Sequence, residues 1–161
     1  MSARGVAAAA AFLPLALAGC KALGFGGEEE RWESARVEGI GADDLWTLVG
    51  TSVARDGFRR LEVDREKGTG TSAWLVSLYP YSGGGWRERA HVRLEPAGER
   101  AWKIGVRIER EKNETVRRPL VEAEAEWEPD ADDAERARIV ARRIGAALGA
   151  APSSGAGGGP R

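Results

Sequence analysis

The chain has 161 residues, with 24 lysines and arginines against 25 aspartates and glutamates, so its formal net charge at pH 7 is −1. This balance gives no electrostatic basis for binding nucleic acid. The single histidine and single cysteine exclude the usual zinc-binding ligand sets. The length suits one domain of ordinary size.

Residues 1–19 have the composition of an export signal. Arg4 precedes an apolar, alanine-rich stretch from residue 6 to residue 18. This stretch is too short to span a bilayer comfortably as a helix, and it has the length of the apolar part of a secretory signal peptide. It ends in Leu17-Ala18-Gly19-Cys20, where a small pair directly precedes the only cysteine.

These four residues resemble the lipobox of bacterial lipoproteins. The resemblance implies cleavage before Cys20, whose thiol would carry diacylglycerol and whose new amino group is often acylated too. The alternative is a chance cysteine after an ordinary secretory signal, which would leave one unpaired thiol in an exported protein. A lipidated Cys20 would anchor the chain to a membrane. Lys21 replaces the aspartate that retains many lipoproteins at the inner membrane, which favours the outer membrane, facing the periplasm, in a Gram-negative host.

Composition divides the rest of the chain into three parts. Residues 20–31 are rich in glycine and charge and are expected to form a flexible tether. Residues 150–161 are rich in glycine, serine and proline and are expected to be disordered. The folded domain is therefore expected to span residues 32–149.

Two helices bracket this domain in the expected order of elements. The first runs over residues 42–56, with Asp43 as its cap and Gly57 as its left-handed end. The last runs over residues 132–148, where Asp132 and Glu135 resemble a capping box. The apolar stripes of both helices follow the helical period, and they consist of Leu45, Trp46, Val49 and Val53 in the first and Ala137, Val140, Ala141, Ile144 and Leu148 in the last.

Between the helices, apolar and polar residues alternate as in an antiparallel sheet with one dry face. Five strands are expected, over residues 59–64, 71–79, 89–95, 101–110 and 121–127. Trp74, Trp102 and Trp127 are assigned to the dry face and Leu75 to the other face. The expected fold class is α+β, a two-layer sandwich in which both helices cover one face of a five-stranded sheet.

Charge predicts the register of the sheet, because opposite charges across a strand pair stabilise it and like charges destabilise it. For the third and fourth strands this favours Arg89 opposite Glu109 and Glu95 opposite Lys103. For the fourth and fifth strands it places Lys103 near Glu126, Arg107 near Glu122 and Trp102 beside Trp127.

A second resemblance rests on the order of elements and a few spaced residues. A tryptophan-containing helix, Gly57-Phe58, a strand that ends in Asp64-Arg65, a glycine turn and the pair Ala73-Trp74 are similar to the helix-grip domains of envelope lipoproteins, such as the C subunit of the outer-membrane barrel-assembly machinery. The resemblance covers about residues 44–148. It implies an α+β fold and brings no catalytic residues.

No constellation in the sequence indicates catalysis, a metal or a cofactor. His91 is expected to be a solvated surface residue, because no orienting carboxylate or nucleophile is evident for it. The acidic run from Asp130 to Asp133 lacks the ligand spacing of a calcium loop and is better explained by helix capping. The outward glutamates at positions 122, 124, 126 and 128 are expected to pair with basic residues of the neighbouring strand. We therefore expect a protein that is not an enzyme.

The most informative segment is residues 79–86, YPYSGGGW, whose tyrosine, tryptophan, serine and glycine are typical of recognition loops. Tyr79, Tyr81 and Trp86, with Leu75 beside them, are candidate partner-binding residues. The alternative is a long loop whose Tyr79 and Trp86 complete the core.

Two functions are consistent with these features. The first is a membrane-anchored, non-enzymatic protein-interaction module of the cell envelope, held to the membrane by lipid on Cys20 and bound to an envelope protein. The second is a small apolar-ligand or lipid binder, which should have a cavity of a few hundred Å³ under its last helix, within the usual range of about 300–1,000 Å³.

Overall fold

The computed structural model describes residues 30–78 and 84–148. Cys20, Tyr79 and Tyr81 lie outside these residues, as does the expected C-terminal tail. Within the described residues no helix is long and apolar enough to cross a membrane. The elements, in chain order, are β1 (Glu33–Glu38), α1 (Ala42–Arg55), β2 (Glu62–Asp64), β3 (Thr69–Thr71), β4 (Leu75–Ser77), β5 (Trp86–Gly98), β6 (Ala101–Asn113), the 3₁₀ turn η2 (Glu122–Glu124), β7 (Trp127–Asp130) and α2 (Ala134–Ala147).

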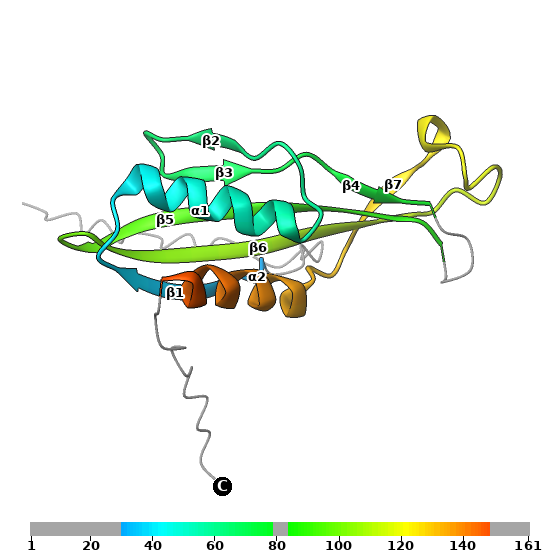
Figure 1. Cartoon of the computed structure of the whole chain (residues 1–161). Helices are drawn as coiled ribbons and strands as arrows, with labels where there is room; N and C mark the ends of the chain where they lie inside the picture. Colours follow the sequence, from blue (N-terminus) through cyan, green and yellow to red (C-terminus); the bar gives the residue numbers. More distant parts are fainter. Residues whose placement is uncertain (1–29, 79–83, 149–161) are drawn as a thin grey trace, which may run out of the picture.

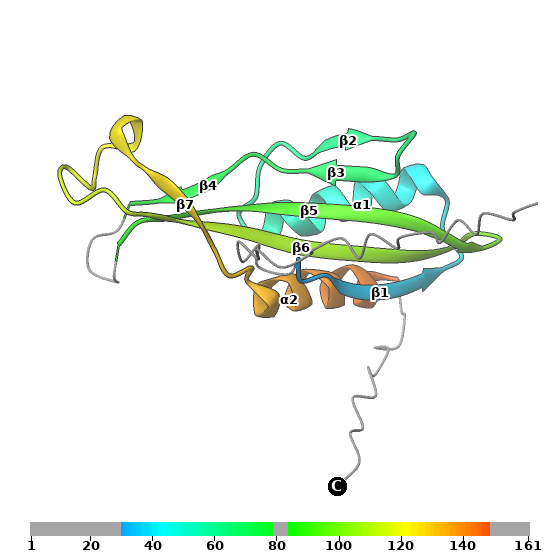
Figure 2. The same cartoon turned by 180° about the vertical axis from the view of Figure 1, so that it is seen from behind.

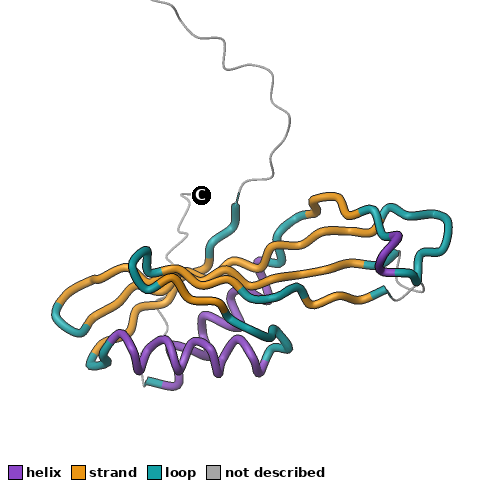
Figure 3. The backbone as a smooth tube through the Cα atoms, turned by 90° about the horizontal axis from the view of Figure 1, so that it is seen from above, coloured by secondary structure: helices purple, strands orange, loops and turns teal. Residues whose placement is uncertain are grey.

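Within the part of the chain that the structure describes, the fold is α+β, with an antiparallel sheet and two helices, but the sheet has seven strands and not five. The strand order is β1-β6-β5-β3-β2, with β4 beside one end of β5 and β7 beside one end of β6. Both helices lie on the same side of the strand layer (Figure 3). The other side of the sheet is called the open face below.

A long hairpin of β5 and β6 forms the centre of the sheet (Figure 1). The register predicted from charge is confirmed, since Arg89 lies opposite Glu109 and Glu95 lies opposite Lys103. A bulge between Pro96 and Gly98 accommodates the turn that this register requires.

The hydrophobic core lies between this hairpin and the two helices, as the alternation predicted. The inward residues of the hairpin are Ala90, Val92 and Leu94 on β5 and Ile104, Val106 and Ile108 on β6, all buried. The helices contribute the expected stripes, among them Leu45, Val49, Val53, Val140, Ala141 and Ile144. Gly57 has φ +93° at the end of α1, and Phe58 packs into the core after it, as expected.

Strand β1 was not predicted, and it changes the neighbours of β6. It pairs with the first half of β6, so the residue opposite Lys103 is Arg36 and the residue opposite Trp102 is Val37. The predicted proximity of Lys103 to Glu126 and of Trp102 to Trp127 is therefore wrong. Ala35 and Val37 are the only apolar residues of β1, and two alternating positions are too few to distinguish a strand from a tether.

The predicted strand over residues 121–127 is also wrong. Glu122–Glu124 form a 3₁₀ turn, and the strand begins only at Trp127. Local side-chain bonds replace strand pairing here, because Thr115 Oγ1 donates to the Glu124 carbonyl and accepts from the Glu126 amide. The glutamates at 122, 124 and 126 therefore form no stripe on a strand, and Arg107 pairs with Asp132 instead of Glu122.

The predicted strand over residues 71–79 is divided into β3 and β4 by Ser72, Ala73 and Trp74. The buried Ser72 hydroxyl accepts from the Ala90 amide and donates to the Ala73 carbonyl, so the regular ladder stops there. This break reverses the predicted faces. Leu75 packs against the core, whereas Trp74 contacts arginines of the open face.

Two helix caps and one strand also differ from prediction. The residue before α1 is Gly41, which offers no side-chain cap, and Asp43 pairs with Arg65. The cap of α2 is Asp133, which accepts from the Arg136 amide at 2.8 Å. The strand expected over residues 59–64 shortens to Glu62–Asp64, because β3 offers only three residues with which to pair.

Candidate functional site

The open face of the sheet carries three tryptophans that the helices do not cover. Figure 2 looks onto this side, where β5 and β6 lie in front of α1. Trp32 comes from the residue before β1, Trp74 from the break before β4, and Trp127 from the start of β7. All three rings are partly buried, and all three contact arginines that alternate along β5.

Arg87 lies between two of these rings. Its guanidinium carbon is 4.3 Å from the centroid of Trp74 and 4.8 Å from that of Trp127. Arg89 also stacks on Trp74, at 4.4 Å. Arg93 covers Trp32 at the same distance of 4.4 Å. Each contact is within the range of favourable cation–π attraction.

The same arginines also form hydrogen bonds and ion pairs with carboxylates. The Arg87 Nε donates to Glu111 Oε2 at 2.6 Å, and Arg89 pairs with Glu109. Farther along β6, the Arg107 Nε donates to Asp132 Oδ2 at 2.6 Å, and this hydrogen bond raises the pKa of Arg107. Arg93 and Lys103 both contact Glu95. Arg36, opposite Lys103 on β1, pairs with Glu38 at 3.0 Å.

The face is therefore close to electrically neutral. Its cations are Arg36, Arg87, Arg89, Arg93, Lys103 and Arg107, and the carboxylates that contact them are Glu30, Glu38, Glu95, Glu109, Glu111 and Asp132. Because each cation has an anionic neighbour, the face exposes tryptophan and arginine side chains without a strongly positive or strongly negative electrostatic potential.

His91 has neighbours that the sequence did not reveal. Its Nδ1 is 3.3 Å from the Thr71 hydroxyl, and its Nε2 is 2.7 Å from Glu109 Oε2. A hydroxyl and an orienting carboxylate therefore flank the imidazole, contrary to expectation. The same carboxylate oxygen also accepts from Arg89, which makes the group part of the ion-pair network. Burial opposes ionisation of Glu109, but bonds from Arg89 and His91 outweigh it and hold its pKa below the usual value.

A second cluster of charges lies on the helix side of the sheet. The carboxyl of Glu88 on β5 is almost fully buried and pairs with Arg136 of α2. Arg136 also donates to the carbonyl of Asp56 at the end of α1, at 2.5 Å, and its guanidinium carbon lies 4.6 Å from the Phe58 ring. Burial raises the pKa of Glu88 in spite of the attraction of Arg136. This cluster joins both helices to the sheet.

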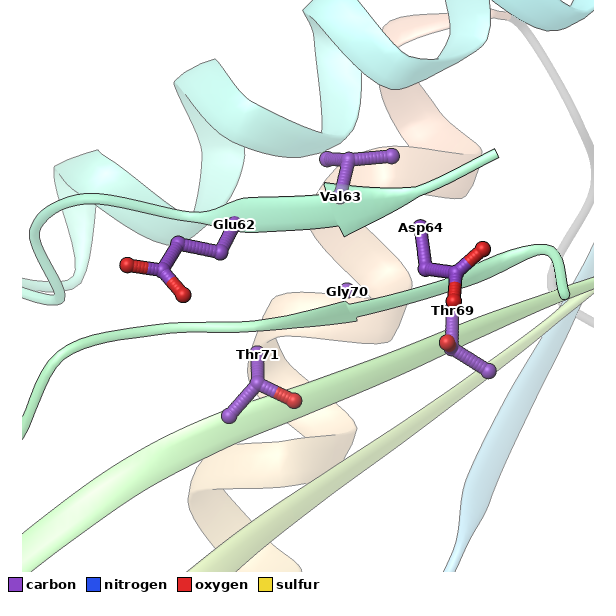
Figure 4. Close-up of a pocket in the computed structure, with 6 residues that line it drawn as sticks. All are labelled: Glu62, Val63, Asp64, Thr69, Gly70 and Thr71. Carbon is purple, nitrogen blue, oxygen red and sulfur yellow. The ribbon is translucent and has the colours of Figure 1, made fainter. Parts of the chain in front are cut away.

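A hollow of about 350 Å³ lies on the β2–β3 hairpin (Figure 4). It is lined by Glu62, Val63, Asp64, Thr69, Gly70 and Thr71. The space beneath α2, where a small-ligand binder would need its cavity, is filled by Val140, Ala141 and Ile144, each at most 2% exposed. No group of three or more metal-binding side chains occurs within residues 30–78 and 84–148.

Of the predicted partner-binding residues, the structure describes Leu75 and Trp86, and it places both on the helix side of the sheet, away from the open face. Trp86 lies on the helix side, where Arg110 stacks on its ring at 5.6 Å, and Leu75 packs against the core. The alternation in the sequence had placed Trp74 and Trp127 in the core, and it gave Trp32 no role. Arginines at alternate positions 87, 89 and 93 were a usable signal, because a strand with cations on one face favours aromatic neighbours there.

Comparison with known proteins adds little. Neither the models of protein families nor the curated proteins contain a match to this chain. Among solved structures, it is similar to the crystal structure of a TBP-like protein from Parabacteroides distasonis ATCC 8503, with a TM-score of 0.35 and 9% identity, over 71% of this chain and 81% of that chain. At this TM-score the similarity supports no inference about function.

Proposed function

We propose that this protein is a lipid-anchored module of the cell envelope that binds another protein through the open face of its sheet. The observation that carries the interaction is the gathering of Trp32, Trp74 and Trp127 with four arginines on the open face, which neither α1 nor α2 covers. Tryptophan and arginine are the residues most enriched where binding energy concentrates in protein interfaces. The anchor is the lipid on Cys20 that the lipobox resemblance implies.

The neutrality of the face supports a protein partner over a nucleic acid, which would need a net positive surface. The ion pairs also limit the role of long-range attraction, so the association should depend only weakly on ionic strength. Tyr79 and Tyr81 remain proposed contributors through the loop that joins β4 to β5. Catalysis has no part in this proposal.

The anchor is tested by replacing the lipidated residue. Cys20→Ala should leave the precursor unprocessed or release the domain from membranes, because the thiol that carries the lipid is gone. Membrane fractionation and intact mass spectrometry report the outcome. An unmodified Cys20 in the mature wild-type protein would refute the lipoprotein assignment.

The interface is tested by photo-crosslinking in living cells. A photoreactive residue at Lys103, which is about half exposed on the open face, should form an adduct with a protein partner. Trp74→Ala and Trp127→Ala should each reduce the adduct yield about tenfold or more, which corresponds to a binding loss of about 1.4 kcal/mol.

Ile139→Ala is the matched control, because Ile139 is an exposed apolar residue on the outer side of α2. It should leave the yield unchanged. Circular dichroism of each variant checks that the fold persists. Equal yields from the wild type and both tryptophan variants, with the fold intact, would remove the open face from the interface.

A further inference from the structure

The start of the described chain is attached to the open face. The Arg31 amide donates to Asp132 Oδ2 at 3.0 Å, and Glu30 Oε1 is 2.8 Å from Arg107 Nη1. Trp32 lies over Gly105, where an added Cβ would be 3.2 Å from the ring. The described chain therefore begins on the side of the sheet opposite the helices.

The length of chain between this point and Cys20 limits how the domain can sit on a membrane. Nine residues lie between Cys20 and Glu30, so ten Cα-to-Cα steps join them. A fully extended chain of that length spans at most about 35 Å. A glycine-rich chain of ten residues has a root-mean-square length of only about 18 Å.

This reach favours one orientation of the domain. For the helices to face the membrane, the chain would have to pass the sheet edge and a helix about 10–12 Å across. Passing the sheet edge and the helix would use most of the root-mean-square length of this ten-residue chain, and little would remain to reach the bilayer. With the open face toward the membrane, the chain runs directly from Glu30 to the lipid.

We infer, on the basis of the proposed lipidation of Cys20, that the open face is turned toward the membrane and meets a protein embedded in that same membrane. The balanced charges of the face argue against phospholipid headgroups as its ligand, because anionic headgroups attract surfaces with an excess of lysine and arginine. A protein that presents an uncharged or charge-balanced surface at the bilayer fits both the orientation and the electrostatics.

Energy transfer on vesicles tests the orientation. The chain from Cys20 to Arg161, which contains every described residue, is coupled through its sole thiol to a maleimide lipid. The vesicles hold phosphatidylethanolamine and phosphatidylglycerol in a ratio of about 3:1, with an acceptor-labelled lipid. A donor dye is attached through a non-natural amino acid at Lys103 on the open face or at Arg142 on the exposed side of α2.

Transfer from position 103 should exceed transfer from position 142, by an amount that corresponds to at least about 10 Å of distance, roughly the thickness of one helix. Equal transfer, or stronger transfer from position 142, would overturn the inference. Inserting twenty glycine and serine residues after Gly27 should abolish the difference. If the difference survives this insertion, the face binds lipid directly, and the assignment to a protein partner is wrong.

This experiment does not depend on processing in the cell, because the lipid is attached chemically. Failure of the orientation and failure of the proposed lipidation are therefore distinguishable. In cells, the partner in the Lys103 adduct should remain in the membrane after extraction with alkaline carbonate. An adduct whose partner is released as a soluble protein would overturn the inference.

Discussion

At the residue scale, the open face depends on arginine and not merely on positive charge. Arg87 is held by two indole rings from different segments of the chain and by one carboxylate from the neighbouring strand. A planar guanidinium can stack on the rings while its edge donates to the carboxylate. A lysine ammonium cannot fill both roles, so the geometry of this face requires arginine at this position.

The pH dependence of stability should reveal the network around Glu109. Its pKa is lower in the folded protein than its usual value of 4.5, so its contribution is complete above that value and is lost as the pH falls through the folded pKa. Glu109→Gln should therefore flatten the loss of stability in acid and cost about 1 kcal/mol at pH 7.

Urea unfolding between pH 7 and pH 3 measures both effects. Glu128→Gln, at an exposed position on β7, is the control and should follow the wild type. A Glu109→Gln protein with the same acid dependence as the wild type would show that the bonds from Arg89 and His91 do not stabilise the fold.

At the scale of elements, Glu88 and Arg136 hold the two helices against the hairpin. Arg136 contacts Glu88 on β5, Asp56 at the end of α1 and the face of Phe58. Arg143, about two turns along the same helix, also pairs with Asp56 at 2.8 Å. The end of α1 is thus joined to both halves of α2 through charges that lie next to the hydrophobic core.

Removing Glu88 should be more damaging than removing any exposed carboxylate. Glu88→Ala leaves Arg136 without one of its partners in a buried site, and such a loss typically costs about 3–5 kcal/mol. Because Arg136 keeps Asp56, we expect the lower end of this range. Glu88→Gln should cost less, since its amide oxygen can still accept from Arg136.

The free energy of unfolding, measured with urea, tests this order. Glu62→Ala, at an exposed position on β2, serves as the control and should be nearly neutral. A cost below about 1 kcal/mol for Glu88→Ala would mean that the helices are held by apolar packing alone.

At the scale of the whole molecule, the hairpin of β5 and β6 is longer than the layer of helices that covers it. Its far end extends past α1 and α2 and is flanked there by β4 and β7 (Figure 1). Each strand of the hairpin has 13 residues, whereas β4 has three and β7 has four. Stability should therefore be uneven along the sheet.

Amide hydrogen exchange should follow this arrangement. The slowest exchange is expected in β6 from Ile104 to Ile108, because this segment is buried beneath the helices and lies next to β5. β2, β4 and β7 should exchange much faster, because each is short and pairs on one side only. Mass-spectrometric detection resolves these segments, and uniform protection across all seven strands would contradict the expectation.

Some features of the candidate site could be predicted from the local amino-acid pattern, and others could not. The register of the hairpin was predictable, because the signs of Arg89, Glu95, Lys103 and Glu109 allow one favourable pairing. The environment of His91 was not, since Thr71 and Glu109 approach it from two different strands. The face of Trp74 was predicted wrongly, because Ser72 interrupts the ladder and reverses the alternation that follows it.

The sequence by itself determined the α+β class, the limits of both helices to within about two residues and the apolar stripes that form the core. These features depend on contacts between near neighbours along one helix or across one hairpin. Only the tertiary structure decided that β1 pairs with β6, and that Trp32, Trp74 and Trp127 meet the arginines of β5 on the open face. Those contacts join segments far apart in the chain. Several alternating segments could pair with the same edge of β6, and only the assembled three-dimensional structure decides which of them does.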